Sequence, residues 1–318
     1  MLYEAAPLEG LTDYVFRRAH SQCFAPADRY YTPFLSPTQV HRLSAGEERE
    51  LRPENNEGVN LIPQLLGHNA EDFLWMTGEL RALGYTEVNL NLGCPSGTVT
   101  AKKKGAGLLA DRALLQRFLD DIFEKSPLPI SIKTRVGYSS AEELPALLEL
   151  LGRYPIKELI VHPRTREMFY AGEPLLSAWE QALGTLSCPV CYNGNLFTRA
   201  DSERLFAQFP QTERIMLGRG LIANPNLIGE LRNGTPLTTD RLQTFHELLA
   251  AGCRERSAGE QPFLHHMKEL RFYWRGCFEN AEKPLKAIKK ATSAAAYDTA
   301  VKQLFRECPL SESPGYKS

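Results

Sequence analysis

The sequence predicts an α/β fold, a (β/α)8 TIM barrel followed by an all-helical domain. Three observations predict this fold. Short apolar runs rich in β-branched residues alternate with helical segments throughout residues 1–236, which is the pattern of βαβ units and a parallel sheet. Eight such runs fit within this length, as a barrel of this kind requires. Beyond residue 236 only helical periodicity continues. A doubly wound sheet is the alternative, because periodicity alone does not show whether the sheet closes.

The expected elements follow in order along the chain. The strands are residues 2–6, 29–32, 59–66, 87–92, 129–134, 158–162, 190–193 and 214–217. Helices between them are residues 70–83, 113–124, 141–151, 200–209 and 221–231, the first with Asn69 as N-cap and Gly84 as C-cap. The second domain has helices at 241–255, 262–275, 283–291 and 295–305. We therefore expect a barrel domain (1–236), a helical domain (237–308) and a flexible tail (309–318) containing serine, proline and glycine.

Composition excludes several classes of protein. Hydrophobic residues make up 43% of the 318, and no apolar run approaches the roughly 20 residues of a membrane helix. The first residues lack the pattern of a signal peptide, so we expect a cytoplasmic protein without a membrane partner. The seven scattered cysteines argue against a disulfide framework, and Cys188 and Cys191 in one expected strand would face opposite ways, so we expect no metal site. The net charge of −1 gives no support for nucleic-acid binding, which would have to depend on local clusters.

Candidate functional residues stand where the expected strands end, because active sites of such barrels lie at that end. These residues are Pro7, Leu8, Glu9, Gln64, Asn89, Asn91, Cys94, Lys133, Arg135, His162, Arg164, Thr165, Asn193, Gly194, Asn195, Gly218 and Arg219. The ring is rich in amide and basic groups and poor in carboxylates. Such a ring suits an anionic or carbonyl-rich ligand.

Three parts of this ring have a specific interpretation. Gly194 and Gly218 would let backbone N–H groups approach a phosphate, with Arg219 adding charge; alternatively these glycines only make tight turns. Lys133 ends a buried strand and needs an acceptor, for which a flavin N1–C2=O edge or a glutamate in the barrel mouth would serve. Cys94 in an exposed loop can act as an acid, although the residues alone favour a structural cysteine.

One glycine-rich stretch is a false signal for a dinucleotide site. Gly105–Ala110 matches G-x-G-x-x-A, but it follows Lys102–Lys104 rather than a strand. It therefore lacks the context of a dinucleotide-binding turn. Close packing of the backbone around a bound ligand is its expected role.

Seven motifs, in order, resemble those of the tRNA-dihydrouridine synthase family. They are Ala6–Asp13 (APLEGLTD), Gln64–Gly67 (QLLG), Asn89–Pro95 (NLNLGCP), Ser131–Gly137 (SIKTRVG), Val161–Arg166 (VHPRTR), Asn193–Gly194 and Met216–Arg219. Each motif is weak alone. Together, at the expected strand ends and over nearly the whole chain, they are specific.

The resemblance implies FMN as bound cofactor, NADPH as the source of electrons, and reduction of uridine to 5,6-dihydrouridine in RNA, with tRNA as the expected substrate. We also expect a monomer. It implies hydride transfer from flavin N5 to uracil C6 and makes Cys94 the catalytic acid that protonates C5. By the same resemblance, the cofactor would be held by Pro7, Leu8, Glu9, Gln64, Lys133, His162, Asn193, Gly194, Asn195, Gly218 and Arg219. The substrate would meet Asn91, Arg135 and Arg164.

A basic surface for RNA is expected on the helical domain. Lys283, Lys286 and Lys290 share one side of a helix, and Lys268 with Arg271 forms a second stripe. Without the resemblance, a solvated lysine face is the simpler interpretation.

The chain departs from the family pattern on the expected substrate side, at Gly97, Pro163 and Asn195. The alternatives are therefore the same chemistry on another RNA such as rRNA, or an FMN barrel oxidoreductase acting on a small molecule.

Overall fold

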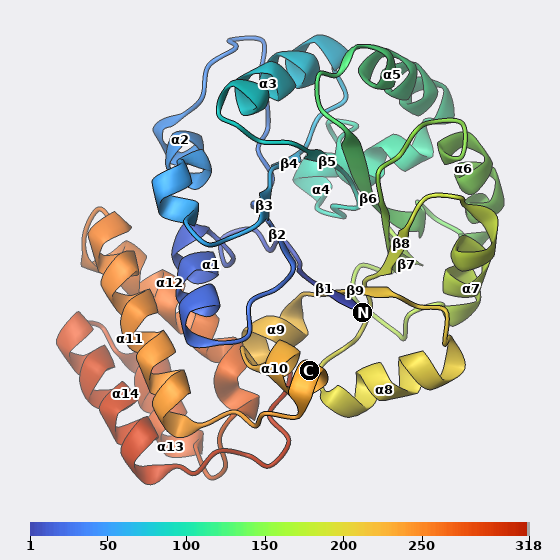
Figure 1. The fold of residues 1–318 in the computed structure, drawn as a ribbon. Coiled ribbons are helices and arrows are strands. Elements are labelled where there is room, and N and C mark those ends of the chain that lie inside the picture. The colour runs from blue at the N-terminus through green and yellow to red at the C-terminus, as the bar shows by residue number, and fades with distance from the viewer. Residues whose placement is uncertain (317–318) are drawn as a thin grey trace.

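The computed structural model describes residues 1–316, and the first 217 supply a parallel barrel (Figure 1). Its strands are β1 (Leu2–Ala5), β2 (Arg29–Tyr31), β3 (Leu61–Ile62), β4 (Gln64–Leu65), β5 (Val88–Leu92), β6 (Ile130–Gly137), β7 (Leu159–Thr165), β8 (Val190–Tyr192) and β9 (Arg214–Leu217). They are ordered β3-β2-β1-β9-β8-β7-β6-β5-β4. Each of the eight expected strands is found, and the third is divided into β3 and β4.

The barrel closes within the stretch that contains β3 and β4. β3 pairs with β2, β4 pairs with β5, and Pro63 between them has no N–H to donate. Leu35 bridges the division, since its N–H donates to Gln64 O and its carbonyl accepts from Leu66 N–H, both at 2.8 Å. β3 and β4 are therefore two parts of one strand. The predicted TIM barrel is confirmed, and the doubly wound sheet is excluded.

Helices cover the outside of the barrel and apolar side chains fill its inside. The helices are α1 (Tyr14–Cys23), α2 (Ala45–Leu51), α3 (Ala70–Ala82), α4 (Gly97–Thr100), α5 (Arg112–Lys125), α6 (Leu144–Leu151), α7 (Leu176–Thr185), α8 (Arg199–Gln208), α9 (Arg219–Ala223) and α10 (Leu227–Asn233). Within the strands, a buried layer is formed by Ala6, Tyr31, Ile62, Ile160, Cys191 and Met216. The inside is thus a packed core, as in other barrels of this type.

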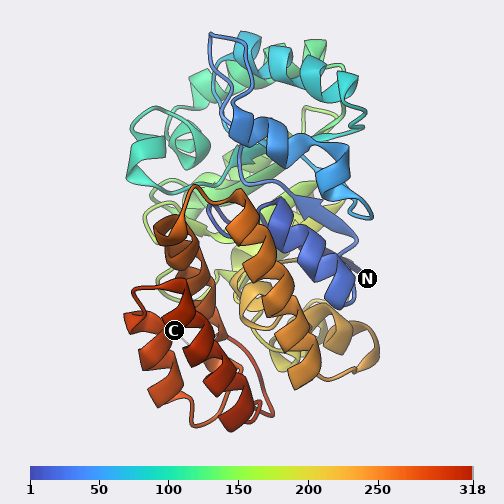
Figure 2. The ribbon, with the colours of Figure 1, turned by 90° about the vertical axis from the view of Figure 1, so that its left-hand side faces the viewer.

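The second domain lies beside α1 (Figure 2) and consists of α11 (Thr239–Arg256), α12 (Glu260–Tyr273), α13 (Glu282–Lys290) and α14 (Ala294–Glu307). Phe245 packs edge-on against Phe16 of α1, with ring centres 5.7 Å apart. Trp274 donates from Nε1 to Ile222 O at 2.7 Å. One apolar cluster therefore runs from α1 through the helical domain. In the part of the chain that the structure describes, no helix is both long and apolar enough to cross a membrane.

Residues 309–316 pack against both domains, which differs from the expected flexible tail. Pro309 O accepts from Glu279 N–H at 2.9 Å, and Ser311 N–H donates to Cys277 O at 2.8 Å. Gly315 passes so close to the barrel that a Cβ there would lie 3.0 Å from Phe197 O. The glycine that suggests flexibility in the sequence instead permits this close approach. The last two residues of the expected tail lie outside the described residues.

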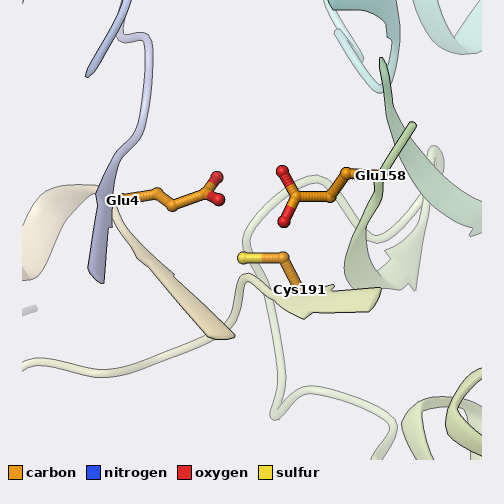
Figure 3. Close-up of side chains that lie close together, drawn as sticks. All are labelled: Glu4, Glu158 and Cys191. Carbon is orange, nitrogen blue, oxygen red and sulfur yellow. The ribbon is translucent and has the colours of Figure 1, made fainter. Parts of the chain in front are cut away.

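Buried charges gather near the N-terminal ends of the strands. Arg29 of β2 donates to Glu158 Oε2 at 2.5 Å, pairs with Glu87, and lies 3.9 Å from Glu4 Oε1. The carboxylates of Glu4 and Glu158 point toward each other, and they and the Cys191 sulfur have ligand atoms within 4.8 Å of one another (Figure 3). Burial and the neighbouring Glu158 raise the pKa of Glu4. Arg214 also pairs with Glu158 at 2.9 Å and Lys157 with Glu87 at 2.8 Å, so three cations serve these carboxylates and the cluster has a structural explanation without a metal.

Candidate active site

The expected site residues of the barrel come together at the C-terminal ends of the strands. Asn91 of β5 pairs in register with Lys133 of β6, and Arg135 pairs with His162 of β7. Lys133 and Arg135 are two residues apart and therefore share one face of β6. Parallel strands bring these side chains to one opening of the barrel, at the C-terminal ends of the strands, as the sequence predicts. This opening is the mouth of the barrel.

Asn91 holds the turn that carries Cys94. Its Oδ1 accepts from Gly93 N–H at 3.0 Å and from Cys94 N–H at 2.9 Å, while its Nδ2 donates to Gln64 Oε1 at 2.7 Å. Gln64 in turn donates to Asn89 Oδ1 at 2.8 Å. The sequence assigns Asn91 to the substrate. The structure instead uses both ends of its amide to fix the turn, and the residue is only 8% exposed.

Two glycines of the stretch Gly105–Ala110 pack closely, the first against the Cys94 turn and the second against Thr100 of α4. Gly105 has φ +56°, and a Cβ there would lie 3.0 Å from both Cβ and O of Cys94. A Cβ on Gly107 would lie 2.7 Å from Thr100 O. Ala106 N–H also donates to Cys94 O at 3.1 Å. The glycine-rich stretch therefore serves close packing, and the Cys94 turn is its partner.

The Cys94 thiol is placed to act as an acid. It is half-buried, and burial raises its pKa, an effect opposed by a backbone hydrogen bond from Ser96 and by the charges of Arg135 and Lys133. A thiol with a raised pKa stays protonated at neutral pH. This cysteine can therefore donate a proton, and the nearby cations would stabilise the thiolate that remains.

Lys133 is a cation without a partner. Desolvation by the surrounding protein, followed by the nearby Arg135, lowers its pKa to about 8. Within residues 1–316, its Nζ has neither a hydrogen-bond acceptor nor a carboxylate in reach. The glutamate that the sequence allows as a partner is thus not found in the described chain. A desolvated ammonium requires an acceptor, so this position favours a ligand with a carbonyl or anionic edge.

His162 has a neutral ring with one N–H group that lacks an acceptor in the described chain. Arg164 Nη1 lies 3.1 Å from its Nε2. Because a guanidinium only donates, Nε2 must accept, and the proton of the neutral ring is on Nδ1. Burial, together with the charge of Lys133, holds the pKa of His162 well below its usual value. The Nδ1–H group is therefore left to donate to a ligand.

Two arginines that the sequence assigns to the substrate lie beneath the mouth instead. Arg135 is 1% exposed and donates at 2.8 Å to three carbonyls, which are Gly93 O, Thr165 O at the end of β7 and Phe169 O in the loop after β7. Arg164 is fully buried and donates to two other carbonyls of that loop, at 3.2 and 2.5 Å. Buried carbonyls need donors, and these guanidinium groups supply them. These positions correct the prediction that both arginines contact the substrate. Both hold the loop after β7, and Arg135 also holds the Cys94 turn.

Close packing explains the backbone at the ends of β8 and β9. Asn193 donates from Nδ2 to Met216 O at 2.8 Å. A Cβ on Gly194 would overlap the ring of Tyr192, so only glycine fits there. Gly218, before α9, would place a Cβ in ordinary contact with its neighbours. Packing therefore accounts for Gly194, and a phosphate role for these two glycines stays a prediction.

Arg219, like Lys133, has no acid partner in the described chain. Its Nη2 donates to Asn195 Oδ1 at 3.0 Å. Its guanidinium carbon lies 4.7 Å from the ring centre of Tyr170, 5.2 Å from that of Phe197 and 5.0 Å from that of Tyr316. No carboxylate of the described chain forms an ion pair with it. Aromatic faces leave the in-plane N–H groups of an arginine available, and such groups bind anions well.

The loop after β1 borders the mouth. Pro7 and Leu8 are half-buried, and Glu9 is exposed. Leu8 packs against the apolar layer inside the barrel, and its N–H donates to Thr12 Oγ1 at 2.8 Å. These positions fit a wall of the site, and contact of the three residues with the cofactor stays a prediction.

The helical domain presents part of the predicted basic surface. Lys283, Lys286 and Lys290 of α13 are exposed, and Lys268 of α12 donates to a backbone carbonyl. Arg271 corrects the prediction, because it is 2% exposed and stacked 4.6 Å from the ring centre of Trp274. Its face of α12 packs into the core of the domain, so Arg271 cannot be a surface contact for RNA.

Two residues of the loop after β7 are not predicted as separate candidates from the sequence. Tyr170 is 52% exposed and lies over the mouth, with its ring centre 5.5 Å from the guanidinium carbon of Arg135 and 6.0 Å from that of the His162 ring. Arg166 donates to Thr100 Oγ1 at 3.3 Å, which ties the loop to α4. An aromatic residue soon after a strand end is the signal that could have found Tyr170.

Comparison with known proteins places this geometry in context. The chain is 28% identical over 236 residues to the "Probable tRNA-dihydrouridine synthase 1" of Synechocystis, an alignment that covers 72% of this chain and 63% of the relative. It is 29% identical over 243 residues to the "tRNA-dihydrouridine(16) synthase" of Escherichia coli, covering 73% and 75% of the two chains. The chain thus spans less than two thirds of the Synechocystis protein.

Solved structures share the barrel. Morphinone reductase superposes with a TM-score of 0.53 at 15% identity, over 77% of this chain and 88% of that chain. The old yellow enzyme of Trypanosoma cruzi does so with a TM-score of 0.51 at 11% identity, over 79% and 93%. At such identities the likeness shows the fold alone.

The dihydrouridine synthase (Dus) family model matches residues 4–308, which include the barrel, the mouth and the four helices α11 to α14. The chain therefore belongs to the dihydrouridine synthase family.

Proposed function

We propose that this protein is an FMN-dependent enzyme that reduces uridine to 5,6-dihydrouridine in tRNA with electrons from NADPH. The observation that carries the proposal is that Cys94, a thiol whose pKa is raised by burial, shares the barrel mouth with Lys133, a desolvated cation without a partner in the described chain. Membership in the family and the names of the two relatives support the reaction and the substrate.

The residues of the mouth fit a flavin. Lys133 Nζ and the His162 Nδ1–H are donors that lack acceptors in the described chain and would hold the carbonyl edge of the ring. Arg219, between the loops after β8 and β9, would hold the phosphate together with Gly194 and Gly218. Bound and reduced FMN would supply the hydride that adds to C6 of uracil.

Cys94 supplies the second hydrogen of the product. Saturation of the C5=C6 bond adds a hydride at C6 and a proton at C5, so an acid near C5 gives up one proton in each turnover. Its raised pKa keeps the thiol protonated until that moment. Asn91 fixes the sulfur by binding the N–H of Cys94. Solvent then returns a proton to the thiolate.

The helical domain is the proposed RNA platform. Between α12 and α13 lies a cavity of about 580 Å³, with Phe272 and Leu285 among its apolar lining residues and Lys268 and Lys286 among its cations. The exposed lysines of α13 continue this charge and would contact phosphates. The target uridine must leave its stack to reach the mouth.

A cysteine substitution tests the reaction. In Cys94→Ala we expect flavin reduction by NADPH at the wild-type rate, because the thiol takes no part in it. We expect dihydrouridine, measured by mass spectrometry of tRNA, to fall by about 10²-fold or more. Cys23→Ala, at a half-buried cysteine of α1, is the matched control. A protein that refuses FMN, or unchanged product from Cys94→Ala, would contradict the proposal.

Charge reversal tests the RNA platform. The double substitution Lys286→Glu and Lys290→Glu should weaken tRNA binding and lower its salt dependence by about one for each phosphate that the protein no longer neutralises. Arg117→Glu is the control, because Arg117 is exposed on α5, far from α13 in Figure 1. Equal effects from both variants would remove the specific role of α13. Turnover of an enone or a free pyrimidine with no turnover of RNA would favour the small-molecule alternative.

A further inference from the structure

We propose that residues 309–316 form part of the cofactor site, and that Tyr316 is a positioning residue that fixes Arg219 for the phosphate of the cofactor. The inference rests on the proposed function, because it assumes that the cofactor carries a phosphate. It extends that function to a segment that lies beyond the last helix of the described chain, α14.

The segment is fastened along its length. Leu310 forms an antiparallel bridge with Phe278, and Ser311 N–H donates to Cys277 O at 2.8 Å. Farther along, Asn224 donates from Nδ2 to Pro314 O at 3.4 Å. Both Pro314 and Gly315 are buried. These contacts carry the chain from the helical domain to the loops after β8 and β9.

Tyr316 lies where this path reaches the mouth. Its ring centre is 5.1 Å from that of Phe197, in the loop after β8, and 5.7 Å from that of Tyr273, at the end of α12. It is also 5.0 Å from the guanidinium carbon of Arg219. Tyr316 thus connects the helical domain to the arginine proposed to bind phosphate.

The arrangement gives Arg219 a defined orientation. The guanidinium lies among the rings of Tyr170, Phe197 and Tyr316, and Asn195 accepts from one of its terminal nitrogens. Cation–π contacts act on the face of the guanidinium and leave its edge to an anion. Without Tyr316, one wall is removed and the long side chain gains rotamers that point away from the phosphate. The cost would appear in the binding of a phosphorylated flavin and not in the binding of the ring.

The test compares FMN with riboflavin, which has the same ring and no phosphate. Flavin-free protein is titrated with each ligand while flavin fluorescence is followed. For Tyr316→Ala we expect the affinity for FMN to fall by about tenfold, within the range that cation–π contacts support. We expect riboflavin affinity to stay within about twofold of wild type. Tyr316→Phe keeps the ring and should restore FMN affinity.

Further variants separate positioning from folding. In the Arg219→Ala background, Tyr316→Ala should cause no further loss of FMN affinity, because its effect acts through the arginine. Unchanged FMN affinity in Tyr316→Ala overturns the inference, and so does an equal loss of FMN and riboflavin, which marks general damage. If the wild-type protein binds neither flavin, the proposed function is wrong, and the inference about Tyr316, which depends on it, is wrong as well.

Discussion

Replacing Lys133 by methionine should stabilise the flavin-free protein while it weakens flavin binding. The ammonium is desolvated without an acceptor in the described chain, and its pKa is lowered from 10.5 to about 8. A tenfold change in proton affinity corresponds to about 1.4 kcal/mol, so holding the charge there costs the folded chain about 3 kcal/mol. Methionine has a similar length and no charge. We therefore expect the free energy of unfolding at pH 7 to rise by about 1–3 kcal/mol.

The pH dependence of this gain has a defined sign. Below pH 8 both the folded and the unfolded chain carry the Lys133 charge, and the folded chain bears the full cost. Between about pH 8 and 10.5 the unfolded chain binds more protons, so the wild-type protein gains stability as pH rises. Above this window neither state is charged and the cost disappears. The advantage of Lys133→Met should therefore be largest at pH 7 and close to zero near pH 10.5.

Urea unfolding of flavin-free protein, followed by circular dichroism at several pH values, measures both the wild type and the variant. Taking the difference between the two curves removes the titration of groups that do not interact with Lys133. Lys102→Met, at an exposed lysine, is the matched control and should change stability by no more than about 0.5 kcal/mol. Destabilisation by Lys133→Met at pH 7, or a difference that does not vary with pH, would show that the Lys133 charge does not destabilise the flavin-free fold.

Three further predictions concern the Cys94 turn. Asn91→Ala leaves two backbone N–H groups and Gln64 Oε1 without their partner, so the free energy of unfolding should fall by about 2–3 kcal/mol in urea titrations; no loss would mean that water replaces the amide. Gly105→Ala should lower the melting temperature, because the left-handed φ of +56° costs about 1–2 kcal/mol and the contact of the new Cβ with Cys94 costs more. Gly10 is also left-handed but has open space around it, so Gly10→Ala should show only the backbone cost. Alkylation of Cys94 in flavin-free protein should rise at higher pH than that of a free thiol such as glutathione, because burial raises its pKa; alkylation that is already fast at neutral pH would contradict the assignment of an acid.

Local patterns in the sequence were enough to predict the strands, the caps and the mouth. Asn69 accepts from Asp72 N–H at 3.0 Å at the start of α3, and Gly84 just after that helix has φ +91°. These features depend on neighbours within a few residues, which sequence periodicity reports directly. The mouth followed because parallel strands must end together, whatever lies between them.

Contacts between distant segments could not be predicted in the same way. The spacing of Lys268 and Arg271 indicates neighbours on one helix, but not that the Arg271 side faces Trp274 and the core. The position of Arg135 in β6 predicts its place at the mouth, but the carbonyls it binds include that of Thr165, at the end of the next strand. Residues 309–316 resemble a flexible tail by composition, although their partners lie in both domains, with Cys277 in the helical domain and Asn224 in the barrel domain.

The two ends of the barrel show why burial of a charge does not by itself mark a functional site. At the N-terminal ends of the strands, Arg29 meets Glu158 and Glu87, so these charges have partners of opposite sign close by. At the other end, Lys133 and Arg219 have no acid partner in the described chain, although one of them is desolvated strongly enough to lower its pKa to about 8. The balanced cluster is explained by stability, whereas the unbalanced end carries a cost that folding alone does not offset. A bound anion or carbonyl would offset it, so the absence of partners, more than the presence of cations, locates the ligand.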